Sequence, residues 1–148
     1  MSVSRGRIVK DLRALGIEEG DHLGLGISLK KVGLVVTGTL LHTAMTSAKQ
    51  LDESGLGVTV LHMPTIKPLD TAALDVLAAE HESIVTLEEH QVAGGLGSAV
   101  AEYLSSTQPK KIVRLGVQDK FGQSGTPEEL LAHYGMDVSA VVETIKTL

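Results

Sequence analysis

Cysteine and tryptophan are absent from this 148-residue chain, and its aromatic residues are limited to one Phe and two Tyr. Without cysteine, the chain can form neither a disulfide nor a thiolate metal site. Because aromatic side chains are so few, a core must be built from Val, Leu, Ile and Ala. Such a core suits a layered α/β packing, with β-branched residues in the strands and Leu and Ala in the helices.

The chain also lacks a basic surplus and a long apolar run. Its formal net charge is −5, and its basic clusters are short: Lys30-Lys31, and Lys110-Lys111 followed by Arg114. We therefore expect no nucleic-acid partner. No apolar run approaches the ~18 residues of a membrane span, and the opening MSVSRGRIVKDLRALG contains no hydrophobic signal core. These absences predict a cytoplasmic protein without a membrane partner.

Apolar runs alternate with amphipathic segments along most of the chain. The short continuous runs VGLVV, GVTVLHM, SIVTLEE and KIVRLGV fit strands that are covered on both faces. Between them, one-sided apolar stripes predict helices at residues 39–54, from Asp70 and from Gly95. A helix after each strand implies a mainly parallel sheet. Two further helices close the chain, with caps at Thr126 and Asp137.

The segment LEEHQVAGGLGSAVAE, residues 87–102, joins a predicted strand to a glycine-rich helix start. Ligands of open α/β sheets bind at the edge formed by the carboxyl ends of the strands. Free N–H groups at a helix start also favour an anion. A second interpretation has Glu88 and Glu89 bind backbone N–H groups or neighbouring side chains at an interdomain contact. We do not expect this group to be catalytic by itself.

Two loops offer other candidate residues. In the connector MPTIKPLD, residues 63–70, two prolines hold the backbone extended and Lys67 offers a charge to a partner domain. The loop after the last strand carries the only Phe, and Phe121 is either a plug over the core or an anchor for a partner. Ser124 lies in the same loop without a strand-to-helix elbow, so we do not expect a nucleophile.

Metal and nucleotide motifs are missing from the sequence. The six His show neither HxH nor HExxH spacing. There is no P-loop, and no GxGxxG follows a strand. We therefore assign no catalytic, cofactor-binding or metal-binding residue to the chain.

Four blocks, in this order, resemble the C-terminal domain shared by transketolase, 1-deoxyxylulose-5-phosphate synthase and the β subunits of 2-oxo acid dehydrogenases. They are VVTGTLLHTA, LHMPTIKPLD, VTLEEHQVAGGLGSAVAE and DKFGQSGTPEELLAHYGMD, within residues 33–148. The resemblance implies a three-layer α/β/α sandwich with a mostly parallel five-stranded sheet and one antiparallel edge strand. The candidate for that edge strand is His22–Ser28, which alternates apolar with small or polar residues.

The same resemblance implies a non-catalytic domain or small subunit that serves in assembly. In that family, thiamine diphosphate and Mg²⁺ are held by other domains, so we expect both in partner domains or subunits and none bound directly here. The expected partner is a catalytic transketolase-type subunit, and the isolated chain is expected to form a homo-oligomer. The interface candidates are Glu88, Glu89, His90, Gly94, Gly95, Gly97, Ser98, Asp119 and Phe121.

Residues 1–32 depart from the family pattern, and we treat them as a separate N-terminal helix and edge-strand segment of one structural domain. Residues 11–33 are similar to the opening of aminoglycoside 3-N-acetyltransferases, but Gly26-Ile27-Ser28 replaces the His-Ser-Ser typical of that strand end. Two rival functions remain open. One is an autonomous acyltransferase, and the other is a free-standing small-ligand or regulatory module that uses the crevice near Gly38-Thr39 and residues 94–98.

Overall fold

A computed structural model describes residues 32–148 of the chain. The predicted first helix, the strand proposed at His22–Ser28 and most of the segment that resembles acetyltransferases lie outside the described residues. The division of the chain at residues 32 and 33 therefore stays a prediction. The first described strand begins at Val32.

A four-stranded sheet forms the middle of the molecule, with the order β2-β1-β3-β4 and every pairing parallel. The strands are β1 (Val32–Val36), β2 (Val58–His62), β3 (Ser83–Gln91) and β4 (Lys111–Val117). In the register, Val35 of β1 lies opposite Leu61 of β2 and Thr86 of β3. The predicted parallel sheet is confirmed. The predicted fifth, antiparallel strand is not among the described elements and stays a prediction.

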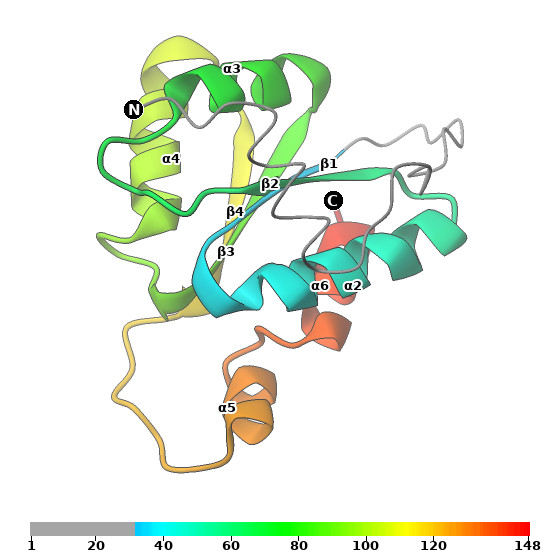
Figure 1. Ribbon diagram of the computed structural model, residues 1–148, viewed down its shortest axis with the longest axis vertical. Coiled ribbons are helices and arrows are strands. Elements are labelled where there is room, and N and C mark those ends of the chain that lie inside the picture. The colour runs from blue at the N-terminus through cyan, green and yellow to red at the C-terminus, as the bar shows by residue number, and fades with distance from the viewer. Residues whose placement is uncertain (1–31) are drawn as a thin grey trace.

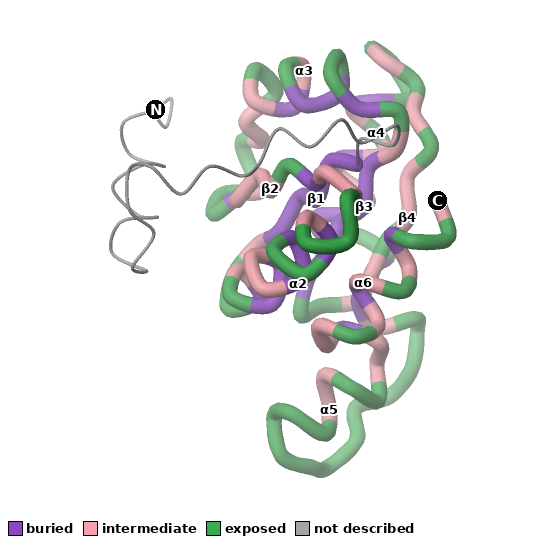
Figure 2. Tube along the Cα trace, turned by 90° about the vertical axis from the view of Figure 1, so that its right-hand side faces the viewer, coloured by how far each residue is buried: buried purple, intermediate pink, exposed green. Residues whose placement is uncertain are grey.

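Helices cover both faces of the sheet, which confirms the predicted α/β/α layers (Figure 1). A short 3-10 turn, η1 (Gly38–Leu40), leads into the first helix. One face carries α2 (Leu41–Glu53) and α6 (Val138–Lys146), and the other carries α3 (Thr71–Glu80) and α4 (Leu96–Thr107). The short helix α5 (Pro127–His133) projects away from these layers and buries none of its residues (Figure 2).

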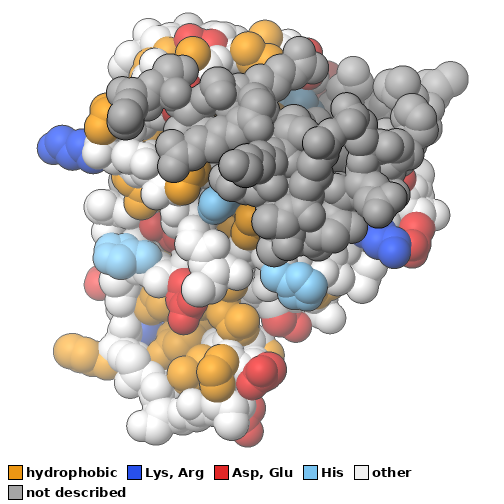
Figure 3. All heavy atoms as spheres, viewed as in Figure 1, with side chains coloured by type: hydrophobic (Ala, Val, Ile, Leu, Met, Phe, Trp, Pro, Cys, Tyr) orange, Lys and Arg blue, Asp and Glu red, His pale blue; other side chains and the backbone are white. Residues whose placement is uncertain are grey.

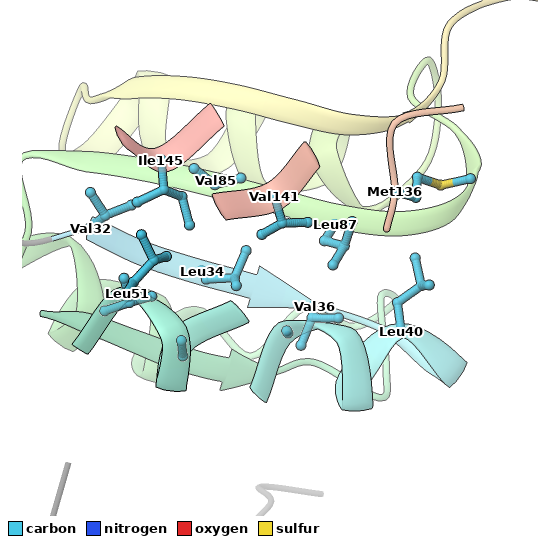
Figure 4. Packing of buried hydrophobic residues seen from close by; sticks show 13 residues of the cluster. Val32, Leu34, Val36, Leu40, Leu51, Val85, Leu87, Met136, Val141 and Ile145 are labelled. Atoms are coloured by element: carbon cyan, nitrogen blue, oxygen red, sulfur yellow. The ribbon is translucent and has the colours of Figure 1, made fainter. Parts of the chain in front are cut away.

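Two clusters of buried apolar side chains hold the helices against the two faces of the sheet. On one face, Leu34 and Leu87 of the sheet pack with Leu51 of α2 and with Val141 and Ile145 of α6 (Figure 4). On the other face, the members are Val35, Met63, Leu74, Leu77, Ala78, Ile84, Leu96, Val100 and Leu104. None of the buried hydrophobic residues in the described part is aromatic. The core is therefore made of aliphatic side chains, as the composition predicts.

The predicted helix caps are present. The Asp70 carboxylate accepts a hydrogen bond from the Ala73 N–H at 3.0 Å, and the Asp137 carboxylate accepts one from the Ala140 N–H at 3.1 Å. Thr126 and Glu129 form a reciprocal capping box at the start of α5. The two hydrogen bonds from the Thr126 backbone and hydroxyl lower the pKa of Glu129. These contacts fix where the helices begin.

We predict that Gly33→Ala destabilises the fold. A Cβ at Gly33 would lie 2.8 Å from Cδ1 of Ile84 and 2.9 Å from Cγ of Leu77, and overpacking of this kind costs about 1–3 kcal/mol. Gly122→Ala is the matched control, because a Cβ there meets nothing within 4 Å. Its free energy of unfolding should change by about 0.5 kcal/mol or less. Equal urea midpoints for the two variants would contradict the packing of α3 on β1.

Candidate functional site at the carboxyl edge of the sheet

The carboxyl ends of the four strands meet at one edge because all of them run parallel. This edge carries η1, the connector that follows β2, the turn at residues 91–95 and the loop that follows β4. It is the edge at which open α/β sheets bind ligands. All the interface candidates predicted from the sequence lie on or beside this edge.

Glu88 is fully buried, and its carboxylate holds the start of α4. One oxygen accepts a hydrogen bond from the Leu96 N–H and the other accepts one from the Gly97 N–H, both at 2.7 Å. The first N–H groups of a helix have no partner within the helix, and its dipole favours a negative charge there. The chain therefore supplies its own anion to the helix start that the sequence marks as an anion site.

The glycines next to Glu88 are explained by close packing. A Cβ on Gly95 would collide with the Glu88 carboxylate, and one on Gly97 would lie 2.7 Å from Oγ1 of Thr86. Gly94 has a φ of 81°, a backbone conformation that residues with a Cβ rarely adopt. The glycine-rich pattern thus allows β3 and α4 to approach each other around a buried carboxylate.

Glu89 and His90 lie on the surface and are separated from Glu88. The hydroxyl of Thr39 donates to Oε2 of Glu89 at 2.7 Å, which links η1 to the end of β3. Nδ1 of His90 lies 2.9 Å from the backbone carbonyl of Gln91. The acidic pair that the sequence presents as one group is therefore divided: Glu88 faces the interior of this chain, and Glu89 remains accessible.

Ser98 and Arg114 close the turn before α4. The Ser98 hydroxyl donates to the Val92 carbonyl at 3.0 Å and accepts from the Gly94 N–H at 2.9 Å. A guanidinium N–H of Arg114 donates to the same carbonyl at 3.2 Å. The sequence reasoning singled out Ser98 but missed the part played by Arg114, since nothing in the local pattern relates β4 to this turn.

The loop after β4 is held by Gln91, which the sequence reasoning also missed. The Gln91 amide donates to the Lys120 carbonyl at 3.0 Å and accepts from the Asp119 N–H at 2.9 Å. Asp119 has a φ of 50°, and the Tyr134 hydroxyl donates to the Phe121 carbonyl at 3.0 Å. The Phe121 side chain is 97% exposed. It does not plug the core, so that interpretation was wrong; the anchor interpretation stays a prediction.

A groove of about 640 Å³ separates the connector from α4. Ile66, Lys67 and Leu69 form one wall, and the other wall runs along α4 from Gly95 past Tyr103. The Tyr103 hydroxyl lies 2.9 Å from each carboxylate oxygen of Asp75, and this hydrogen bond raises the pKa of Tyr103. We call this feature the connector groove.

The described residues do not fit a diphosphate with its metal ion. Among residues 32–148, no group of three His, Asp or Glu side chains is placed to hold a metal. The helix start that would receive a phosphate already binds Glu88. None of the helices within residues 32–148 is long and apolar enough to cross a membrane.

Comparison with known families gives a match to the model described as "Transketolase, C-terminal domain" over residues 28–141. The chain belongs to this family. The match confirms the resemblance drawn from the four sequence blocks, and it covers every described strand and the start of α6.

Several members of the transketolase C-terminal domain family can be aligned with the chain. The 1-deoxy-D-xylulose-5-phosphate synthase of Chlorobium phaeovibrioides is 40% identical over 114 residues, which are 76% of this chain and 18% of that protein. A putative transketolase C-terminal section of Methanocaldococcus jannaschii is 36% identical over 76% of this chain and 35% of that protein. The chain therefore spans far less than the full length of these relatives.

Among solved structures, a split-gene transketolase in an inactive beta4 tetramer superposes with a TM-score of 0.76 at 42% identity. The similarity covers 80% of this chain and 39% of that one. A transketolase from Campylobacter jejuni, at 22% identity and a TM-score of 0.57, shares the fold. These matches confirm the α/β architecture of the transketolase C-terminal domain.

We predict that Glu88→Gln lowers the free energy of unfolding by about 2 kcal/mol. A glutamine side chain has one acceptor oxygen, so either the Leu96 or the Gly97 N–H would face an amide donor, and a buried unpaired N–H costs about 1–3 kcal/mol. Urea denaturation measures the change. Glu89→Gln is the matched control and should change it by about 0.5 kcal/mol or less, because that side chain is exposed. Equal losses in the two variants would refute the role assigned to Glu88.

Proposed function

We propose that this chain is the non-catalytic C-terminal domain or small subunit of a transketolase-type thiamine diphosphate-dependent enzyme, and that it serves in assembly. One observation carries the proposal: a single family domain accounts for residues 28–141, whereas the aligned relatives are several times longer. The chemistry of such an enzyme then belongs to the parts of the relatives that this chain does not span.

The proposal places thiamine diphosphate and Mg²⁺ in partner domains or subunits. The polar groups at the carboxyl edge support this placement, because Glu88 and Ser98 are engaged within the chain. The exposed members of the predicted interface, Glu89, His90 and Phe121, are free to face a neighbour. In this proposal, Glu88, Gly95 and Gly97 act on an interface through the position of α4. Gly94 and Asp119 shape the two exposed turns beside it.

The proposal includes self-association of the isolated chain. The split-gene transketolase chain that superposes on it is described as an inactive beta4 tetramer, which is an assembly without catalysis. We also keep a cytoplasmic location, without nucleic-acid or membrane partners, as part of the proposal. Its basis is the net charge of −5 and the sequence pattern.

The rival function, a small-ligand module, has one feature in its favour. The connector groove is of the size that holds small ligands, and it borders the predicted crevice at residues 94–98. The start of α4 is not available to an anion, however, because the N–H groups of Leu96 and Gly97 point at Glu88. The assembly role is therefore the better supported of the two.

We predict that the chain alone neither binds thiamine diphosphate nor transfers a ketol group. Isothermal titration calorimetry with thiamine diphosphate and Mg²⁺ should give no binding heat, because residues 32–148 contain no metal-binding cluster and Glu88 occupies the start of α4. Ketol transfer should appear only after a thiamine-binding catalytic subunit is added. Micromolar binding of the cofactor by the isolated chain would refute the proposal.

A further inference from the structure

The loop after β4 projects from the molecule with little support from its own core. Every residue from 118 to 129 is exposed, and α5 buries no residue (Figure 2). Figure 3 shows hydrophobic side chains gathered on the part of the surface that carries this region. We call residues 118–126 the Phe121 arm. A segment of this kind gains no stability from burial within the chain.

The start of the Phe121 arm is nevertheless tied to the rest of the chain by hydrogen bonds. The Gln91 side chain binds the arm through both its amide donor and its acceptor, and Tyr134 binds the carbonyl of Phe121 itself. A loop whose backbone is already held in place loses less conformational entropy when it is bound. Aromatic residues, Phe included, are also enriched at protein interfaces. These contacts hold the backbone of residues 119–121, which carries the exposed Phe121 ring.

The connector groove begins at the same edge of the sheet and runs from there along α4 to Ser106. It follows the carboxyl end of β2 and lies beside the start of α4, while the arm follows the carboxyl end of β4. Ile66, Leu69 and Ala99 give it apolar walls, and Lys67 and Glu102 add one charge of each sign. The arm also carries one charge of each sign beside Phe121, on Asp119 and Lys120. Opposite charges can therefore be paired when the ring lies in such a groove.

We propose that Phe121 of one copy of this chain inserts into the connector groove of a second copy, and that the reciprocal insertion closes a twofold dimer. This contact specifies how the self-association in the proposed function would occur, and it rests on that proposed function. A protomer that offers both a projecting ring and a matching groove on one edge can form an isologous contact, with the same two features used on both sides. Asp119 then faces Lys67, and Lys120 faces Glu102.

Two other self-contacts are less favourable. A contact between two arms offers no concave site for either ring. Pairing of two β4 edges is hindered by Gln118, whose side-chain amide donates to the backbone carbonyls of Arg114 at 3.1 Å and Gly116 at 3.4 Å. These contacts occupy groups on the strand edge that a second strand would need. The arm and the groove are thus the complementary pair that the described surface provides.

Cross-linking tests the proposed contact directly, because the chain has no cysteine of its own. Gly122→Cys labels the arm next to Phe121, and Ser106→Cys labels the groove wall. A mixture of these two variants, treated with a short bismaleimide, should give a linked dimer in which mass spectrometry finds the 122–106 pair. Ser105→Cys is the matched control: Ser105 and Ser106 are exposed neighbours that both donate to the Glu102 carbonyl, but only Ser106 lines the groove. Equal cross-linking to 105 and 106 would overturn the proposal.

Sedimentation velocity supplies the energetic test. Phe121→Ala should raise the dissociation constant of the dimer by about 30-fold or more, the effect of losing one anchor residue. Val76→Ala is the control, because Val76 is also an exposed apolar residue (63%) but lies on α3, outside the groove. A wild-type chain that stays monomeric at high concentration would overturn the dimer. An unchanged dissociation constant for Phe121→Ala would also overturn it. The same holds if Phe121→Ala weakens only the binding of a catalytic subunit and leaves the dimer unchanged.

These outcomes are distinguishable from failure of the proposed function. The assembly role within a thiamine diphosphate enzyme fails if the isolated chain binds the cofactor, which calorimetry detects whatever the oligomeric state. The dimer contact fails in sedimentation or cross-linking, whatever the calorimetry gives.

Discussion

The buried carboxylate of Glu88 is the contact on which the carboxyl edge of this domain depends. A charge that is fully removed from water is costly unless it is paired or hydrogen-bonded, and here two backbone N–H groups at the positive end of a helix provide the compensation. The same contact fixes where α4 begins. The close approach of Gly95 and Gly97 to β3 follows from it, and so does the position of the α4 wall of the connector groove.

Because Glu88 occupies the start of α4, this helix start is not open to a ligand. In many open α/β folds the helix start at this position receives a phosphate of a ligand, but in this chain it receives a side chain of the preceding strand. The groups that remain outward are the Glu89 carboxylate, the His90 ring and the exposed Phe121. They differ in charge and polarity, as the residues of protein interfaces do. An anion from solution would have to displace the Glu88 carboxylate before it could bind the start of α4.

Much of the fold could be predicted from the sequence, because continuous apolar runs and capping residues are local signals. Asp70 and Asp137 cap the helices that their positions predict. The division between Glu88 and Glu89 was also present as a period-two signal: Ile84 and Thr86 face the α4 layer, and Glu88 continues their face. The hydrogen bond between the Gln91 side chain and Asp119, 28 residues later, could not be predicted from local sequence, because it depends on how β3 and β4 pair.

The end of β3 connects the two parts of the candidate site. Glu88 holds α4 on the inner side of the sheet, and three residues later Gln91 holds the exposed loop through Asp119 and Lys120. β3 is paired with β1 as far as Leu87, and its end is paired only with β4, where the register shifts before Gln91 comes to lie opposite Val117. The loop is exposed and is held at its start by this strand, whereas α5 packs on the core through the partly buried Leu131. A displacement of the end of β3 would therefore move the groove wall and the exposed Phe121 together, which makes this strand the element that fixes their relative position.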